Sequence, residues 1–105
     1  MKHYLKRGDT ARKFQDTLTA GGAPLDLSGA TVAFVMRNKC TQTVRKSVAT
    51  VVEATEGTVE YQPVALDVGT VGEFLCEWEI TYAGGKTQTV PEEGYIELQV
   101  KADLG

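Results

Sequence analysis

The fold of this 105-residue chain is decided by residues 72–82, which read GEFLCEWEITY. Its apolar side chains recur at every second position and share one face: Phe74, Cys76, Trp78, Ile80 and Tyr82. Polar side chains occupy the other face, with Leu75 as the exception. A period of two predicts a half-buried antiparallel strand. We therefore expect Phe74, Trp78 and Tyr82 in the core.

Similar short segments continue on both sides of this strand. Residues 86–91 return as the second arm of a hairpin after a glycine-containing turn, and residues 95–101 alternate in the same way. Residues 63–71 contain a proline and a glycine, so we expect at most one helical turn there. Alternation, with Phe34 also facing the core, predicts further strands at residues 2–7, 12–19, 25–29, 31–37, 43–53 and 58–62.

This pattern predicts one all-β domain over residues 1–105, an antiparallel sandwich of about 7–9 strands. Hydrophobic residues make up 42% of the chain and charged residues 24%, as in soluble globular proteins. The longest apolar run covers residues 32–36, whereas a membrane helix needs about 20 residues, so we expect no membrane span. The first residues carry no secretory signal, which predicts synthesis and folding in the cytoplasm.

Charge is unevenly distributed along the chain. Residues 1–52 hold nine Lys and Arg against three acids, and residues 53–105 hold two Lys against eleven acids, which gives +6 and −9. One interpretation is that basic early strands lie beside acidic late strands within one molecule. The other is that two oppositely charged faces meet between copies or partner proteins.

Candidate chemistry is sparse. His3 is the single histidine and lies at the start of an expected edge strand, which argues against a catalytic triad. Cys40 and Cys76 are 36 residues apart without the spacing of a metal site, and we expect Cys76 in the core and Cys40 in an exposed loop. We expect no catalytic residue, no metal and no cofactor.

Two aromatic residues fall outside the apolar phase of the strands. Tyr4 and Tyr95 are therefore candidate interface residues. They also keep open the alternative of a carbohydrate-binding sandwich on a virion or cell surface. Two tyrosines without a basic groove do not favour a nucleic-acid site, and we expect no nucleic-acid partner.

Six segments in order resemble the N-terminal domain of phage baseplate upper proteins. They are residues 6–10 (KRGDT), 24–34 (PLDLSGATVAF), 57–61 (GTVEY), 72–74 (GEF) followed by Glu77, 85–91 (GKTQTVP), and 94–100 (GYIELQV) with Asp103 and Leu104. The resemblance covers nearly the whole chain. It implies an immunoglobulin-like β-sandwich from a tailed phage or prophage.

The residues in these segments have structural roles in our interpretation. Gly8 and Asp9 can turn the chain, and Asp26 can accept hydrogen bonds from backbone groups in the turn that ends at Gly29. Pro91 lacks a backbone donor, which suits a strand end or a sheet edge.

The resemblance implies a non-enzymatic component of a phage tail or baseplate, assembled into the virion in the bacterial cytoplasm. We expect it to be an adaptor whose partners are other tail or baseplate proteins, with a homo-oligomer as a further possibility. Residues 2–7 and 86–91 are the edge strands that we expect to engage these neighbours.

Overall fold

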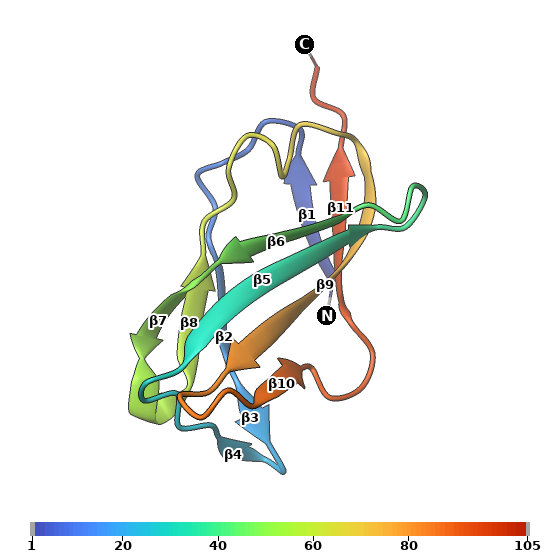
Figure 1. Ribbon diagram of the computed structural model, residues 1–105. Coiled ribbons are helices and arrows are strands. Elements are labelled where there is room, and N and C mark those ends of the chain that lie inside the picture. The colour runs from blue at the N-terminus through green and yellow to red at the C-terminus, as the bar shows by residue number, and fades with distance from the viewer. Residues whose placement is uncertain (1, 105) are drawn as a thin grey trace.

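A computed structural model describes residues 2–104; Met1 and Gly105, which the expected domain includes, lie outside the described residues. The expected all-β sandwich is confirmed (Figure 1). The described part contains one three-residue 3₁₀ helix, η1 (Ala54–Glu56). Its strands are β1 (Lys2–Lys6), β2 (Phe14–Thr17), β3 (Thr19–Ala20), β4 (Ala23–Pro24), β5 (Thr31–Asn38), β6 (Val44–Val48), β7 (Thr50–Glu53), β8 (Thr58–Tyr61), β9 (Gly72–Thr81), β10 (Thr87–Val90) and β11 (Ile96–Lys101).

Two sheets form the sandwich. The larger has the order β1-β11-β9-β5-β6, with β10 pairing with β9, and the smaller has the order β2-β8-β7. The chain passes from the larger to the smaller sheet twice, from β1 to β2 and from β6 to β7 (Figure 1). Because these strands are the edges of their sheets, the sandwich is tied together along both sides.

The core forms around β9. β9 pairs with β5 over residues 74–81, and Phe74, Cys76, Trp78 and Ile80 are buried. Phe34 of β5 packs edge-on against Trp78, with the ring centroids 4.8 Å apart. Its ring also stacks with those of Phe14 and Tyr61 from the smaller sheet, at 5.2 and 5.0 Å. Phe34 therefore joins the two layers.

Tyr82 differs from its three companions in the expected core. It lies one residue beyond the end of β9 and is only partly buried, packed against the core margin. Its hydroxyl makes a 2.8 Å hydrogen bond with Oε1 of Gln88 on β10. The alternation of apolar residues therefore extends further along the sequence than the fully covered part of the strand.

Two segments that we expected to be single strands are each divided. Residues 43–53 form β6 in the larger sheet and β7 in the smaller one, with the chain changing sheets at Ala49. Residues 12–19 are interrupted at the buried Leu18, whose N–H donates to the carbonyl of Gly57 at 2.7 Å. These breaks and the short β3–β4 hairpin raise the strand number above the expected 7–9. Alternation identifies the buried face of a strand but not the sheet to which it belongs.

Two further expectations were wrong in detail. Residues 25–29 form no strand, and the two-residue β4 lies just before them. β1 pairs with β11 in parallel, so the larger sheet is not purely antiparallel. The first and last strands are neighbours that run in the same direction, a long-range relation that local patterns do not encode. Residues 63–71, by contrast, agree with the expectation of at most one helical turn: they contain a turn in which the N–H of Asp67 donates to the carbonyl of Val64 at 2.9 Å.

Candidate assembly surfaces

The predicted turn at Gly8 and Asp9 closes the end of β1. Gly8 has a φ of 88°, in the left-handed region that glycine adopts without strain. Asp9 bonds both backbone groups of Lys6: its N–H donates to the Lys6 carbonyl at 3.0 Å, and its Oδ2 accepts from the Lys6 N–H at 3.1 Å. The turn residues are therefore also edge residues.

The other predicted turn residues lie at the opposite end of the sandwich. Oδ1 of Asp26 accepts from the N–H of Ser28 at 3.0 Å and from its hydroxyl at 2.6 Å, and these bonds lower the pKa of the carboxyl group. Gly29 follows with a φ of 73°, next to Ala83 in the turn between β9 and β10. Pro91 directly follows β10.

The β1 edge, which we expected to engage a partner, is blocked. The N–H of Arg7 donates to the carbonyl of Lys101, so the odd-numbered residues of this segment direct their backbone groups towards β11. The even-numbered Tyr4 and Lys6 direct theirs away from β11. Both of these groups on Lys6 bond Asp9, and the Tyr4 carbonyl accepts a 3.3 Å hydrogen bond from Nη1 of Arg12. A partner strand would have to displace these contacts. Such protection is how soluble proteins prevent stray pairing.

The edge of β10, the second expected partner site, is open. The N–H of Tyr82 donates to the carbonyl of Lys86 at 2.8 Å, so Gln88 and Val90 face β9, while Thr87 and Thr89 direct their backbone groups outward. Within residues 2–104, these outward groups have no hydrogen-bond partner. The side chains of both threonines are exposed. β10 is therefore a short, unprotected, polar edge.

Tyr4 and Tyr95, the two candidate interface tyrosines, are each about half exposed. A cation lies over each ring: Lys101 Nζ is 4.9 Å from the Tyr4 ring centre, and the Arg37 guanidinium carbon is 5.6 Å from that of Tyr95. Tyr4 lies beside Gln99 on β11, four residues beyond Tyr95, which separates them by about 13 Å along the strand. The two rings do not form a joint stacking platform for a sugar.

The charge asymmetry of the sequence is largely resolved within the molecule. Five ion pairs each join a cation from residues 1–52 to a carboxylate from residues 53–105. They are Arg7–Asp103, Lys13–Glu60, Lys39–Glu73, Arg45–Asp67 and Lys46–Glu79. The structure thus favours the interpretation in which basic early strands lie beside acidic late ones.

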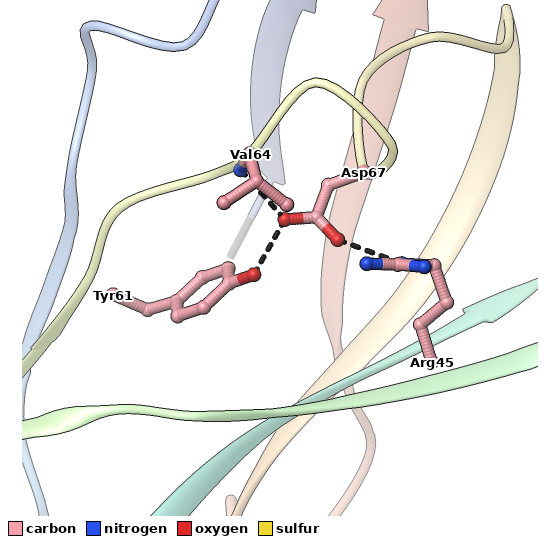
Figure 2. A network of polar contacts seen from close by, with 4 residues as sticks. All are labelled: Arg45, Tyr61, Val64 and Asp67. Atoms are coloured by element: carbon pink, nitrogen blue, oxygen red, sulfur yellow. Dashed lines mark hydrogen bonds and ion pairs between the residues drawn. The ribbon is translucent and has the colours of Figure 1, made fainter.

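Sequence reasoning missed Asp67, the only charged residue among those described that is fully buried. Figure 2 shows its carboxylate at the centre of a polar network. Oδ2 accepts from the Tyr61 hydroxyl at 2.5 Å and from the Val64 N–H at 2.9 Å. Oδ1 accepts from Nε of Arg45 at 2.8 Å. This network holds the loop of residues 62–71 against both sheets. The isolated acid within the apolar run VALDV was the available signal.

The three reactive side chains considered from the sequence, one histidine and two cysteines, form no common site. His3 packs edge-on against Phe14 at 5.5 Å, and partial burial and nearby Arg12 lower its pKa. Cys76 is buried, which raises the pKa of its thiol to about 12, and Cys40 is an exposed free thiol. In the part of the chain that the structure describes, no three His, Cys, Asp or Glu side chains are grouped to hold a metal ion. The same part has no helix with the length and apolar character that a membrane crossing requires.

Comparison with known proteins identifies the family. The family model for the BppU N-terminal domain matches residues 3–102. This chain belongs to the BppU N-terminal domain family. The expected family is thereby confirmed, and with it a structural role in a phage tail or baseplate as a component of the virion. Domains of this family are generally non-enzymatic.

Solved structures show the same fold. The N-terminal domain of phage TP901-1 ORF48 superimposes with a TM-score of 0.66 at 16% identity, over 96% of this chain and 83% of that one. CopC from Methylosinus trichosporium OB3b superimposes with a TM-score of 0.58 at 10% identity, over 99% of this chain and 87% of that one. At these identities the likeness concerns the fold alone. No match was found among curated proteins.

Proposed function

We propose that this BppU N-terminal domain is a rigid adaptor that binds a neighbouring tail or baseplate protein by accepting a strand of that protein beside β10. The family supports the tail or baseplate setting. The open backbone groups of Thr87 and Thr89 support the mode of binding. Strand addition of this kind takes its affinity from main-chain hydrogen bonds.

The rigidity of the β9–β10 hairpin supports this role. β10 is anchored through Val90, which is buried opposite Trp78, and through the bond between Gln88 and Tyr82. A partner strand would therefore meet donors and acceptors that are already held in place. Binding then costs little ordering of the adaptor.

The partner beside β10 is a protein of different sequence. In an antiparallel pairing of two β10 strands centred on Thr89, Thr87 of each copy would lie opposite Pro91 of the other. Pro91 has no N–H, so this register leaves acceptors unsatisfied, and the register that satisfies them, with Thr87 opposite Thr89, is limited to these two residues of each copy. A heterologous strand carries donors at these positions.

The domain acts in this proposal through protein contacts alone. It performs no catalysis, and neither a nucleic acid nor a membrane is its partner; the net charge of −3 and the scattered His3, Cys40 and Cys76 support this. We propose that it joins the virion during assembly in the cytoplasm of the bacterial host.

Incorporation into particles tests the proposal. In the phage that encodes the protein, the wild-type gene is replaced by a gene for the Thr89→Pro variant, which lacks an outward N–H. A second phage carries the matched control Thr89→Ala, which keeps this N–H. Quantitative mass spectrometry of purified particles should find wild type and Thr89→Ala at equal levels, and Thr89→Pro reduced about tenfold or more, corresponding to the loss of about 1.4 kcal/mol of binding free energy. Full incorporation of the folded Thr89→Pro chain would overturn the proposed docking edge. Absence of the wild-type chain from particles would overturn the adaptor role itself.

A further inference from the structure

The opposite edge of the larger sheet, β6, is also open. The N–H of Asn38 donates to the Thr43 carbonyl at 2.9 Å, and that of Ala49 donates to the Val32 carbonyl at 2.8 Å. The odd-numbered residues from 43 to 49 therefore direct their backbone groups towards β5. Val44, Lys46 and Val48 therefore direct their backbone groups away from the sheet. Among the residues described, these groups have no hydrogen-bond partner.

The side chains of β6 leave this edge unprotected. Val44 is 54% exposed and Val48 is 86% exposed, although both are apolar. A lysine on an edge strand usually discourages pairing. Here, however, Lys46 reaches across β5 to Glu79, with Nζ 2.9 and 3.0 Å from the two carboxylate oxygens. Its charge is thus partly neutralised and directed over the sheet face, away from the edge.

The order of the outward residues is a palindrome, Val-Lys-Val at positions 44, 46 and 48. We propose that two copies of this chain pair through β6, antiparallel, around a two-fold axis at Lys46. In that register Val44 of each copy lies opposite Val48 of the other, and the two Lys46 residues lie opposite each other. Each of these residues has both an N–H and a carbonyl directed outward, so every one exchanges both backbone hydrogen bonds with its counterpart.

Self-complementarity is the reason for choosing a second copy as the occupant. A two-fold interface requires that the same patch match itself, and β6 meets this condition in hydrogen bonding and in side-chain type. Cross-strand pairs of exposed valines bury apolar surface, while each lysine retains its own glutamate. The result is one continuous sheet through both molecules. Because only one short strand per copy takes part, the contact belongs with small, weak interfaces.

Light scattering after size exclusion, over a range of protein concentrations, tests the proposal on the purified chain. Wild type should approach twice the 11.4 kDa of the chain as the concentration rises. In Val44→Lys/Val48→Lys, lysines of the two copies oppose each other at both ends of the strand, so we expect a monomer. In Val44→Glu/Val48→Lys, each glutamate faces a lysine of the other copy, so we expect the dimer to return. All substitutions are at exposed positions, and circular dichroism is used to check that each variant is folded.

The outcomes are decisive in both directions. Loss of the dimer in the double lysine variant and its return in the charge-paired variant support pairing through β6. A wild-type chain that stays monomeric up to about 1 mM overturns the proposal. A dimer that persists in the double lysine variant also overturns it, because the contact then lies elsewhere. Thr89→Pro should leave the dimer intact, so this inference and the proposed adaptor role can fail separately.

Discussion

Asp67 is the residue on which the conformation of the loop 62–71 depends. Asp67→Ala would leave the Tyr61 hydroxyl and the Val64 N–H without their acceptor and Arg45 without its carboxylate. Buried polar groups without partners are costly, although Arg45 is partly exposed and regains water. We expect the free energy of unfolding to fall by about 2–3 kcal/mol in urea denaturation.

The control for Asp67→Ala is a substitution in another ion pair that, like Arg45–Asp67, joins residues 1–52 to residues 53–105. Asp103→Ala removes the carboxylate that pairs with Arg7 at 2.8 Å, but both side chains are more than one-third exposed. Exposed pairs contribute about 0–1 kcal/mol, so this change should have little effect. Equal losses for Asp67→Ala and Asp103→Ala would contradict the role assigned to burial.

Tyr61 should make the molecule sensitive to alkaline pH. Burial, together with the hydrogen bond to Asp67, raises the pKa of its hydroxyl above the ordinary value of 10. The resulting stability is complete below pH 10 and is lost as the pH rises through the folded pKa. Tyr61→Phe retains the stacked ring but cannot ionise. We expect its unfolding free energy to fall less steeply than that of wild type above pH 10; parallel curves would refute this. Cys76, whose thiol pKa is also raised, is unchanged in the comparison.

At the scale of elements, the turn between β7 and β8 is fixed by Gly57. Its φ is 69°, and a Cβ there would lie 2.7 Å from the Leu18 carbonyl oxygen and 2.8 Å from that of Leu25. In Gly57→Ala the backbone would be strained, and the new Cβ would collide with backbone oxygens, which can move away only if their chain segments shift. We expect thermal and urea unfolding to show a loss of at least about 2 kcal/mol. Gly84→Ala, at a position with open space and no positive φ, should change stability by less than about 0.5 kcal/mol.

Neighbouring prolines in β10 test the direction in which its backbone groups point. Gln88→Pro removes an N–H that faces Ile80 of β9, whereas Thr89→Pro removes one that faces outward. We expect urea denaturation to show a loss of about 1–3 kcal/mol for Gln88→Pro and of less than about 1 kcal/mol for Thr89→Pro. The reverse order would mean that β10 presents the other set of groups to the solvent.

The elements also show how far sequence reasoning reaches. Alternation in residues 72–82 predicted β9 and its buried face, and the glycine-containing turn after it predicted the hairpin with β10, because these are local relations. It did not predict the change of sheet at Ala49, since a strand alternates in the same way in either sheet. The protection of β1 depends on Arg12 reaching back to the Tyr4 carbonyl, and the outward face of β6 depends on its register with β5. Such relations arise only in the folded chain.

For the whole molecule, the unequal charges of the two halves are a consequence of topology. The five ion pairs connect early basic strands and loops to late acidic ones, so most of the charge asymmetry is neutralised within the sandwich. Charge therefore does not identify the assembly surface. We propose that surface from the backbone groups that have no partner among residues 2–104, at β10 for a different protein and at β6 for a second copy.

A cryo-electron microscopy map of the assembled baseplate tests the central claim most directly. The account predicts a strand of a neighbouring tail protein beside β10, within hydrogen-bond distance of the backbone of Thr87 and Thr89. A map in which this edge faces solvent, with the domain held through other surfaces, would contradict it.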